Sequence, residues 1–178
     1  MVYVFFADGF EEVEAIEPID IMRRAGIEVL TVSLGDAPVT GAHNICVKAD
    51  IVIDEVNKDD IEAIVLPGGG RGHENLDASN SVHALISYAV ANGRYVCAIC
   101  AAPSILGRRQ LLDGKKATCF PGFEKYLYGA DYVTDKVVKD GRFITARGAG
   151  AAAEFGFEIT AALKGRETAE AVKAQMQF

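Results

Sequence analysis

The stretch Tyr95–Ser104, YVCAICAAPS, decides both the fold class and the candidate site. An apolar run reaches Cys100, two alanines follow, and a Pro-Ser pair then marks the start of a helix. Two interpretations compete: a buried strand that contains a cysteine by chance, or a strand-to-helix corner that presents one thiol. A residue at such a corner projects outward, close to the unpaired N–H groups of the next helix, and this environment favours a thiolate. We therefore take Cys100 as the candidate nucleophile.

Strand and helix patterns alternate on both sides of this stretch and are joined by short loops. The predicted strands are Val2–Ala7, Ile27–Ser33, Ala63–Leu66, Arg94–Ile99 and Arg142–Ala146, with a hairpin through 139–141. The predicted helices are Glu11–Ala25, Ser79–Ala91, Ala102–Arg109, Ala151–Leu163 and Glu167–Ala174, and residues 42–53 are expected to be irregular. This order predicts one α/β domain over residues 1–178, with a largely parallel sheet and a ligand site at the carboxyl ends of the strands.

Composition excludes several classes of function. The 178 residues are 50% hydrophobic and carry a formal net charge of -7, with no basic patch, so a nucleic-acid partner is not expected. The apolar runs are far shorter than the roughly 20 residues that span a bilayer, so no membrane partner is expected either. Acidic residues follow the first strand directly and no signal peptide is recognised, which places the protein in the cytoplasm. There, all four cysteines should be reduced.

The stretch LPGGGRGHEN, residues 66–75, is a glycine loop between a predicted strand and a predicted helix. It fits neither G-x-G-x-x-G nor the P-loop, so it is a weak nucleotide signature and no cofactor is expected. A tight turn with positive φ explains Gly68, Gly69, Gly70 and Gly72 adequately. Gly69 also has a third possible use, because a residue without a Cβ allows its backbone N–H to point at a developing oxyanion.

Cys97 and Cys100 form a C-x-x-C pair, but Cys97 lies within the predicted strand, where positions three apart point to opposite faces. A disulfide is therefore disfavoured, and no metal site is expected, because a second cysteine or histidine pair is missing. Cys97 is interpreted as a core residue. Of the three histidines, His83 lies within a predicted helix and His43 in the irregular segment. His73, in the glycine loop, either reaches the site or caps a helix.

Five stretches carry a resemblance to a known family: GFEEVEAIEPIDIMRRAGIEV, LPGG, AICAAPSIL, DGRFITARGAGAAAEFGFEI and AEAVKAQM. Their content and order resemble the ThiJ/PfpI superfamily, most closely its Parkinson-disease-associated deglycase branch. The resemblance implies a flavodoxin-like three-layer sandwich with a mostly parallel central sheet, and a homodimer. It also implies that Cys100 is the nucleophile, that a protonated Glu14 hydrogen-bonds the thiolate, and that Gly69 and Ala101 form an oxyanion hole beside Gly68. From the residues alone, Glu14 is one of several acids on its helix.

Two positions depart from the family pattern. Ala101 stands where the protease-like branch has a histidine after the nucleophile, so peptidase activity is not expected. Phe120 stands where the deglycase branch has a histidine in a Thr-His-Pro context, and Cys119 beside it is interpreted as a core thiol. Arg24 resembles an arginine that binds anions near the partner subunit's cysteine in some family dimers. A favourable charge at a helix C-terminus explains Arg24 equally well.

Two main hypotheses for function follow. In the first, the protein is a glutathione-independent glyoxalase or deglycase whose Cys100 attacks methylglyoxal or an early glycation adduct. In the second, it is a redox-sensing, stress-protective protein in which Cys100 is oxidised to a sulfinate without turnover. A cysteine peptidase-like hydrolase and a mononucleotide-binding protein are more distant alternatives.

Overall fold

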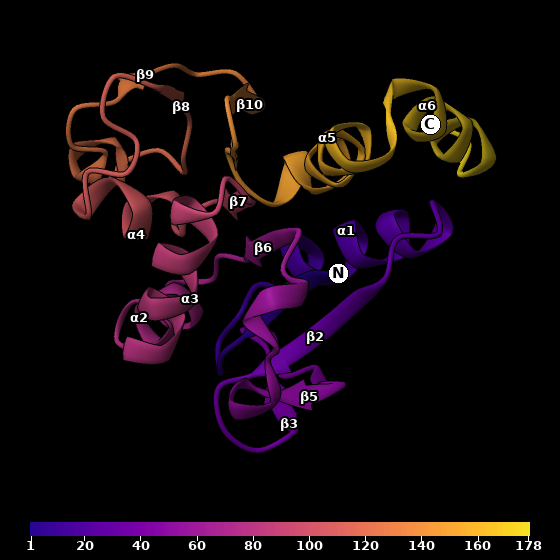
Figure 1. The fold of residues 1–178 in the computed structure, drawn as a ribbon, viewed down its shortest axis with the longest axis horizontal. Helices are drawn as coiled ribbons and strands as arrows, with labels where there is room; N and C mark the ends of the chain where they lie inside the picture. The colour runs from indigo at the N-terminus through magenta and orange to yellow at the C-terminus, as the bar shows by residue number, and fades with distance from the viewer.

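A seven-stranded sheet forms the centre of the computed structural model, which describes residues 1–178 (Figure 1). The strand order is β10-β11-β7-β6-β1-β2-β5, and every neighbouring pair is parallel except β10 and β11. The predicted mostly parallel sheet and its one hairpin are therefore confirmed. The strands are β1 (Val2–Phe6), β2 (Val29–Ser33), β5 (Ile51–Val52), β6 (Ala63–Leu66), β7 (Tyr95–Ile99), β10 (Val137–Asp140) and β11 (Phe143–Ala146).

Helices cover both faces of this sheet and give the predicted three layers. One face packs against α1 (Glu12–Arg24) and α5 (Ala152–Lys164), and α6 (Arg166–Gln175) lies on α5. The other face packs against α2 (Gly70–Asp77), α3 (Asn80–Ala91) and α4 (Pro103–Arg108). Because successive side chains of a strand point to opposite faces, Val4 of β1 enters the first core and Phe5 enters the second. A strand covered on both faces is apolar at every position, as β1 is.

Short strands lie within and just before residues 42–53, the segment that was predicted to be irregular. β3 (Pro38–Thr40) and β4 (Cys46–Lys48) pair as an antiparallel ribbon, and β5 adds a two-residue edge to the main sheet. A second ribbon joins β8 (Lys116–Ala117) and β9 (Asp131–Tyr132). These strands are too short and too exposed to produce an alternating pattern in the sequence. Single turns of 3-10 helix lie at Ile53–Glu55, Lys58–Asp60, Glu124–Tyr126 and Ala149–Ala151.

The prediction that residues 66–75 form a loop throughout was wrong, because α2 begins at Gly70. Glycine is a poor helix former, and several glycines in succession conceal the helix in the sequence. Close packing explains one of them: a Cβ at Gly72 would lie 2.6 Å from the Cα atom of Phe10. Gly69, with φ of 95°, makes the turn between β6 and α2. His73 is consequently a helical residue and not a loop residue.

The topology determines where a ligand site can form. Along β2-β1-β6-β7-β11 the chain order reverses between β1 and β6, and such a reversal opens a crevice at the carboxyl ends of the strands. The segments that leave β1, β6 and β7 at that edge contain Glu14, Gly69 and Cys100 respectively. These three candidate residues therefore lie on segments that leave the same edge of the sheet. No helix combines the length and the apolar character needed to cross a bilayer.

Candidate active site

Cys100 occupies a strained corner immediately after β7. Its φ of 65° lies in the left-handed region, which non-glycine residues rarely adopt and which recurs at functional sites. Two backbone hydrogen bonds hold the corner: the Cys100 N–H donates to the Ala146 carbonyl at 2.9 Å, and the Cys100 carbonyl accepts from the Phe120 N–H at 2.7 Å. The side chain remains partly exposed. The predicted strand-to-helix corner is thus present, and its geometry presents the thiol.

Glu14 is buried beside this thiol, with only 1% of its surface exposed. Its Oε2 accepts a hydrogen bond from the Gly68 N–H at 3.0 Å, and its carboxyl group also hydrogen-bonds the side chain of Cys100. Burial raises the pKa of Glu14 from 4.5 to about 7, the charge of Glu11 raises it further, and these two hydrogen bonds lower it. Glu14 can therefore be protonated near neutral pH, as the resemblance implied.

The pKa of the Cys100 thiol is also shifted. It is raised, whereas the sequence led us to expect an environment that favours the thiolate. Burial raises the pKa of Cys100, and the Glu14 charge and its hydrogen bond raise it further. The N–H groups of Ala101 and Gly69 lower it, but they do not outweigh the burial. The backbone N–H groups at the corner thus favour the thiolate as predicted, but the prediction from the sequence did not include the burial that outweighs them. A second negative charge is disfavoured beside the first, so the two side chains together tend to keep one proton.

Backbone donors surround the sulfur atom. The backbone N–H groups of Gly69 and Ala101 act on the Cys100 side chain and lower the pKa of its thiol, as donors close to a thiolate would. Gly68 has no room for a side chain, because a Cβ there would lie 2.5 Å from Oε2 of Glu14 and 2.6 Å from Cβ of Cys100. Gly69 is restricted in the same way by the backbone of Glu11, whose nitrogen would lie 2.7 Å from a Cβ. Glycine therefore lets the loop after β6 approach the thiol.

A pocket of about 470 Å³ opens beside Glu14. Phe120, which is 47% exposed, lines it together with Arg147 and Gly148. A Cβ on Gly148 would lie 4.0 Å from Oε1 of Glu14 and 3.3 Å from the Phe120 ring, so this loop separates the carboxyl group from the pocket. Of the residues named from the sequence only Phe120 lines this pocket, and Gly148 and Arg147 were not named. The glycines that follow β11 were the available signal, since that loop also leaves the carboxyl end of a strand.

The three histidines do not hydrogen-bond Cys100. His73 is 96% buried, its Nδ1 lies 3.0 Å from the Gly69 carbonyl, and its ring packs edge-on against Phe123. It therefore supports the loop that carries one oxyanion donor. His83 bonds the Asp77 carbonyl through Nε2 at 2.7 Å, away from the site. No histidine is placed to act as a base on the thiol.

The remaining candidates lie outside this cluster. Arg24 is exposed at the end of α1 and pairs with Asp20 at 2.8 Å, so within one chain it has no contact with Cys100. Possible metal ligands of Glu11, Glu12 and His43 lie within 4.8 Å of one another. Glu12 already accepts hydrogen bonds from the His43 N–H at 2.7 Å and from Nδ1 at 2.9 Å. These hydrogen bonds account for the cluster without a metal ion.

The other cysteines behave as predicted. Cys97 and Cys119 are fully buried in the two cores, Cys46 is exposed on β4, and all four thiols are free. Burial raises the pKa of Cys119 to about 12 and raises that of Cys97 as well. Neither buried thiol has a charged partner that would activate it.

Comparison with known proteins matches this geometry to one family. The model of the DJ-1/PfpI family matches residues 1–162. The chain is 34% identical to the Parkinson disease protein 7 homolog of Danio rerio over 97% of its own length and 94% of that protein. It is also 34% identical to a deglycase of Pyrococcus abyssi, over 82% of the chain and 89% of that enzyme.

The solved structure of oxidized DJ-1 from Toxoplasma gondii superposes with a TM-score of 0.94 and 32% identity. The alignment covers 99% of this chain and 97% of the other. Sequence and backbone therefore agree over nearly the whole length, and the implied fold is confirmed. The chain belongs to the DJ-1/PfpI family.

Proposed function

We propose that the protein is a cysteine-dependent glyoxalase or deglycase that acts on reactive aldehydes such as methylglyoxal or on early glycation adducts. The observation that supports this most strongly is the buried carboxyl group of Glu14 against Cys100, with the N–H groups of Gly69 and Ala101 on the same sulfur atom. The arrangement supplies a nucleophile, a proton carrier and an oxyanion site in one cluster. The deglycase of Pyrococcus abyssi supports the same class of activity.

The proposed reaction begins when the pair loses one proton, near the pKa of about 7 of Glu14. The remaining proton stays on Sγ of Cys100, whose pKa is raised, and the Glu14 carboxylate takes this proton as the sulfur attacks. The thiolate attacks the aldehyde carbon, a C–S bond forms, and the carbonyl electron pair moves to the oxygen atom beside the two N–H donors. Proton transfer to that oxygen from Glu14 gives the hemithioacetal.

For methylglyoxal, Glu14 then carries the proton of the former aldehyde carbon to the neighbouring ketone carbon, and the hydroxyl proton of the hemithioacetal moves to the ketone oxygen. This step leaves a thioester, which water hydrolyses to lactate with return of the free thiol. The net reaction consumes one methylglyoxal and one water. A glycation adduct would instead release its amine when water replaces it. Neither route needs the histidine that Phe120 replaces.

We further propose that the protein is a homodimer. Val13 and Ile16 on α1 are 48% and 40% exposed, and Ile45 before β4 is 56% exposed. These apolar side chains have no partner within one chain, and exposed apolar surface of this kind marks interfaces. Arg24 lies at the far end of the same helix, from which it could approach the site of a partner.

The test is lactate production from methylglyoxal without glutathione. Wild type should turn over, whereas Cys100→Ala and Glu14→Gln should lose most of the activity. Cys46→Ala, which removes an exposed thiol elsewhere, is the matched control and should behave as wild type. Equal lactate production by wild type and Cys100→Ala would disprove the proposal.

Redox sensing is the second candidate, and the oxidized state named for the Toxoplasma gondii DJ-1 structure favours it. Peroxide would add two oxygen atoms to Sγ of Cys100, giving a sulfinate that the same N–H donors and a protonated Glu14 would stabilise. Intact-mass analysis after peroxide treatment distinguishes the two candidates. Selective addition at Cys100 in a protein that makes no lactate supports sensing, and random oxidation of all four cysteines argues against it.

A further inference from the structure

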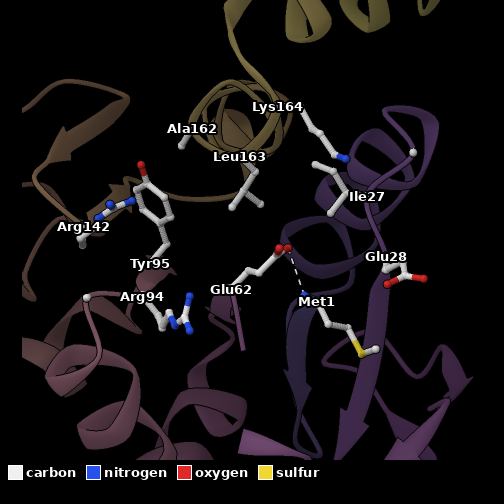
Figure 2. Close-up of a pocket in the computed structure, with 12 residues that line it drawn as sticks. Met1, Ile27, Glu28, Glu62, Arg94, Tyr95, Arg142, Ala162, Leu163 and Lys164 are labelled. Carbon is white, nitrogen blue, oxygen red and sulfur yellow. Dashed lines mark ion pairs between the residues drawn. The ribbon is translucent and has the colours of Figure 1, made fainter. Parts of the chain in front are cut away.

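A second pocket, of about 580 Å³, lies at the opposite end of the sheet from Cys100 (Figure 2). The residues that line it precede the parallel strands: Glu62 comes before β6, Arg94 before β7 and Arg142 before β11. The last turn of α5 closes one side with Leu163 and Lys164. The amino ends of several strands and the carboxyl end of one helix therefore form its walls.

Three cations of this pocket have no carboxylate partner in the protein. The side chains of Arg94, Arg142 and Lys164 make no ion pair and no hydrogen bond with any protein group. Arg23 differs from these three cations, because it lies 2.8 Å from Asp50. In a chain with a net charge of -7, three unpaired cations around one pocket leave their hydrogen-bond donors free for an anion.

The arrangement of the side chains suits a ligand with two charged ends. Figure 2 shows Arg94 and Arg142 on one side with Tyr95, and Lys164 on the other. The Arg142 guanidinium lies 4.6 Å from the centre of the Tyr95 ring, which restricts its position. The apolar side chain of Leu163 lies between the two sides.

The acidic groups of the pocket do not cancel these cations. Glu62 pairs with the Met1 amino group at 3.0 Å, which Figure 2 marks with a dashed line, so its charge is already balanced. Glu28 is exposed and pairs with no cation. Three free cations thus face one free carboxylate, and the pocket has an excess of positive charge.

We propose that this pocket binds a small organic dianion that carries carboxylate or phosphate groups. The two arginines would hold one acidic group through their planar forks, which match carboxylate and phosphate oxygens. Lys164 would hold the second group as a point charge, and the carbon chain would lie over Leu163. The site is separate from the thiol chemistry, since Arg94 and Cys100 lie at opposite ends of the same strand.

The test is titration of the full chain with succinate and, separately, with inorganic phosphate at constant ionic strength, followed by amide NMR and calorimetry. Acetate is the monoanion control. We expect saturable binding of succinate, of phosphate or of both, with shifts at Gly93, Arg94 and Arg142 and none at Cys100. Which anion binds more tightly distinguishes a carboxylate ligand from a phosphate ligand.

Substitutions of the pocket arginines test whether these cations bind the anion. Arg94→Gln and Arg142→Gln should each weaken binding about tenfold or more, since each removes charge-assisted hydrogen bonds. Arg71→Gln, an exposed arginine in α2 at the other end of the sheet, is the matched control and should bind as wild type. Cys100→Ala should also bind as wild type, which keeps the result independent of the proposed catalysis.

Two results would overturn the proposal. One is the absence of saturation by either anion up to concentrations on the order of 10 mM, which corresponds to negligible affinity. The other is equal weakening by Arg71→Gln and Arg94→Gln, because binding would then reflect overall charge. Thermal melts of each variant show whether it is folded. If Arg94→Gln does not fold, Lys164→Gln serves in its place, with the same expected loss.

Discussion

Replacing Glu14 with Gln should change how the stability of the protein depends on pH. The pKa of Glu14 is raised from 4.5 to about 7 in the folded state, mainly by burial. An acid with a raised folded-state pKa binds its proton more tightly in the folded chain than in the unfolded chain. Its contribution to stability is therefore fully present below pH 4.5 and is lost as the pH rises through about 7.

The size of this contribution to the free energy of unfolding follows from the shift in the pKa of Glu14. A rise from 4.5 to about 7 at about 1.4 kcal/mol per pKa unit corresponds to about 3 kcal/mol of unfolding free energy. About 2 kcal/mol of this falls between pH 5.5 and pH 8. Glu14 is 1% exposed, so solvent screens the effect little. Gln has the same shape and no charge, so the variant should lack this part of the pH dependence.

Urea denaturation at pH 5.5 and pH 8 measures the effect for wild type and Glu14→Gln. The difference between the two proteins isolates Glu14, because other titrating groups cancel. Between pH 5.5 and pH 8, the free energy of unfolding should fall by about 2 kcal/mol more for wild type than for Glu14→Gln. Glu167→Gln, an exposed glutamate on α6, is the control and should follow wild type. If the free energy of unfolding changes with pH by the same amount in wild type and in Glu14→Gln, the assignment of a raised pKa to Glu14 is refuted.

Three further outcomes are expected. Gly68→Ala should reduce lactate production about 100-fold, because the new Cβ would lie 2.6 Å from Cβ of Cys100 and displace the thiol. Iodoacetamide should alkylate Cys46 and Cys100 and leave the two buried cysteines unmodified, as peptide mass mapping would show. Ser79→Ala should lower the free energy of unfolding by about 1 kcal/mol in urea, because it removes the side chain that caps the N-terminus of α3.

Much of the fold could be predicted because its strands are covered on both faces. Such strands are continuous apolar runs, and Val2–Phe6 and Tyr95–Ile99 stand out for that reason. The Cys100 corner could be predicted from the change of pattern after Ile99. Helix α2 could not, because glycines conceal its first turn and one of them, Gly72, is required by close packing against the chain after β1. A tertiary contact of this kind leaves no local pattern.

Glu14 shows why the site could not be predicted from the local sequence pattern alone. Glu11, Glu14 and Glu17 recur at helical spacing, and only Glu14 is fully buried. Glu14 lies four residues before Pro18 and seven before Ile21, both buried, so it occupies the core-facing stripe of α1. The exposed Val13 and Ile16 obscure that stripe in the sequence. A carboxyl group at a core position of a helix was therefore the available signal.

In the proposed mechanism, the shared proton would take the role of the histidine that the family resemblance leads us to expect at Phe120. A histidine beside a thiol serves to take its proton and later to return it. Here burial brings the pKa of Glu14 to about 7, so this carboxyl group titrates in the range where a histidine would. Because the pKa of the thiol is raised as well, Glu14 is the member of the pair that loses its proton first. Proton removal and return therefore depend on Glu14 and Cys100 acting together, and loss of either side chain should abolish both.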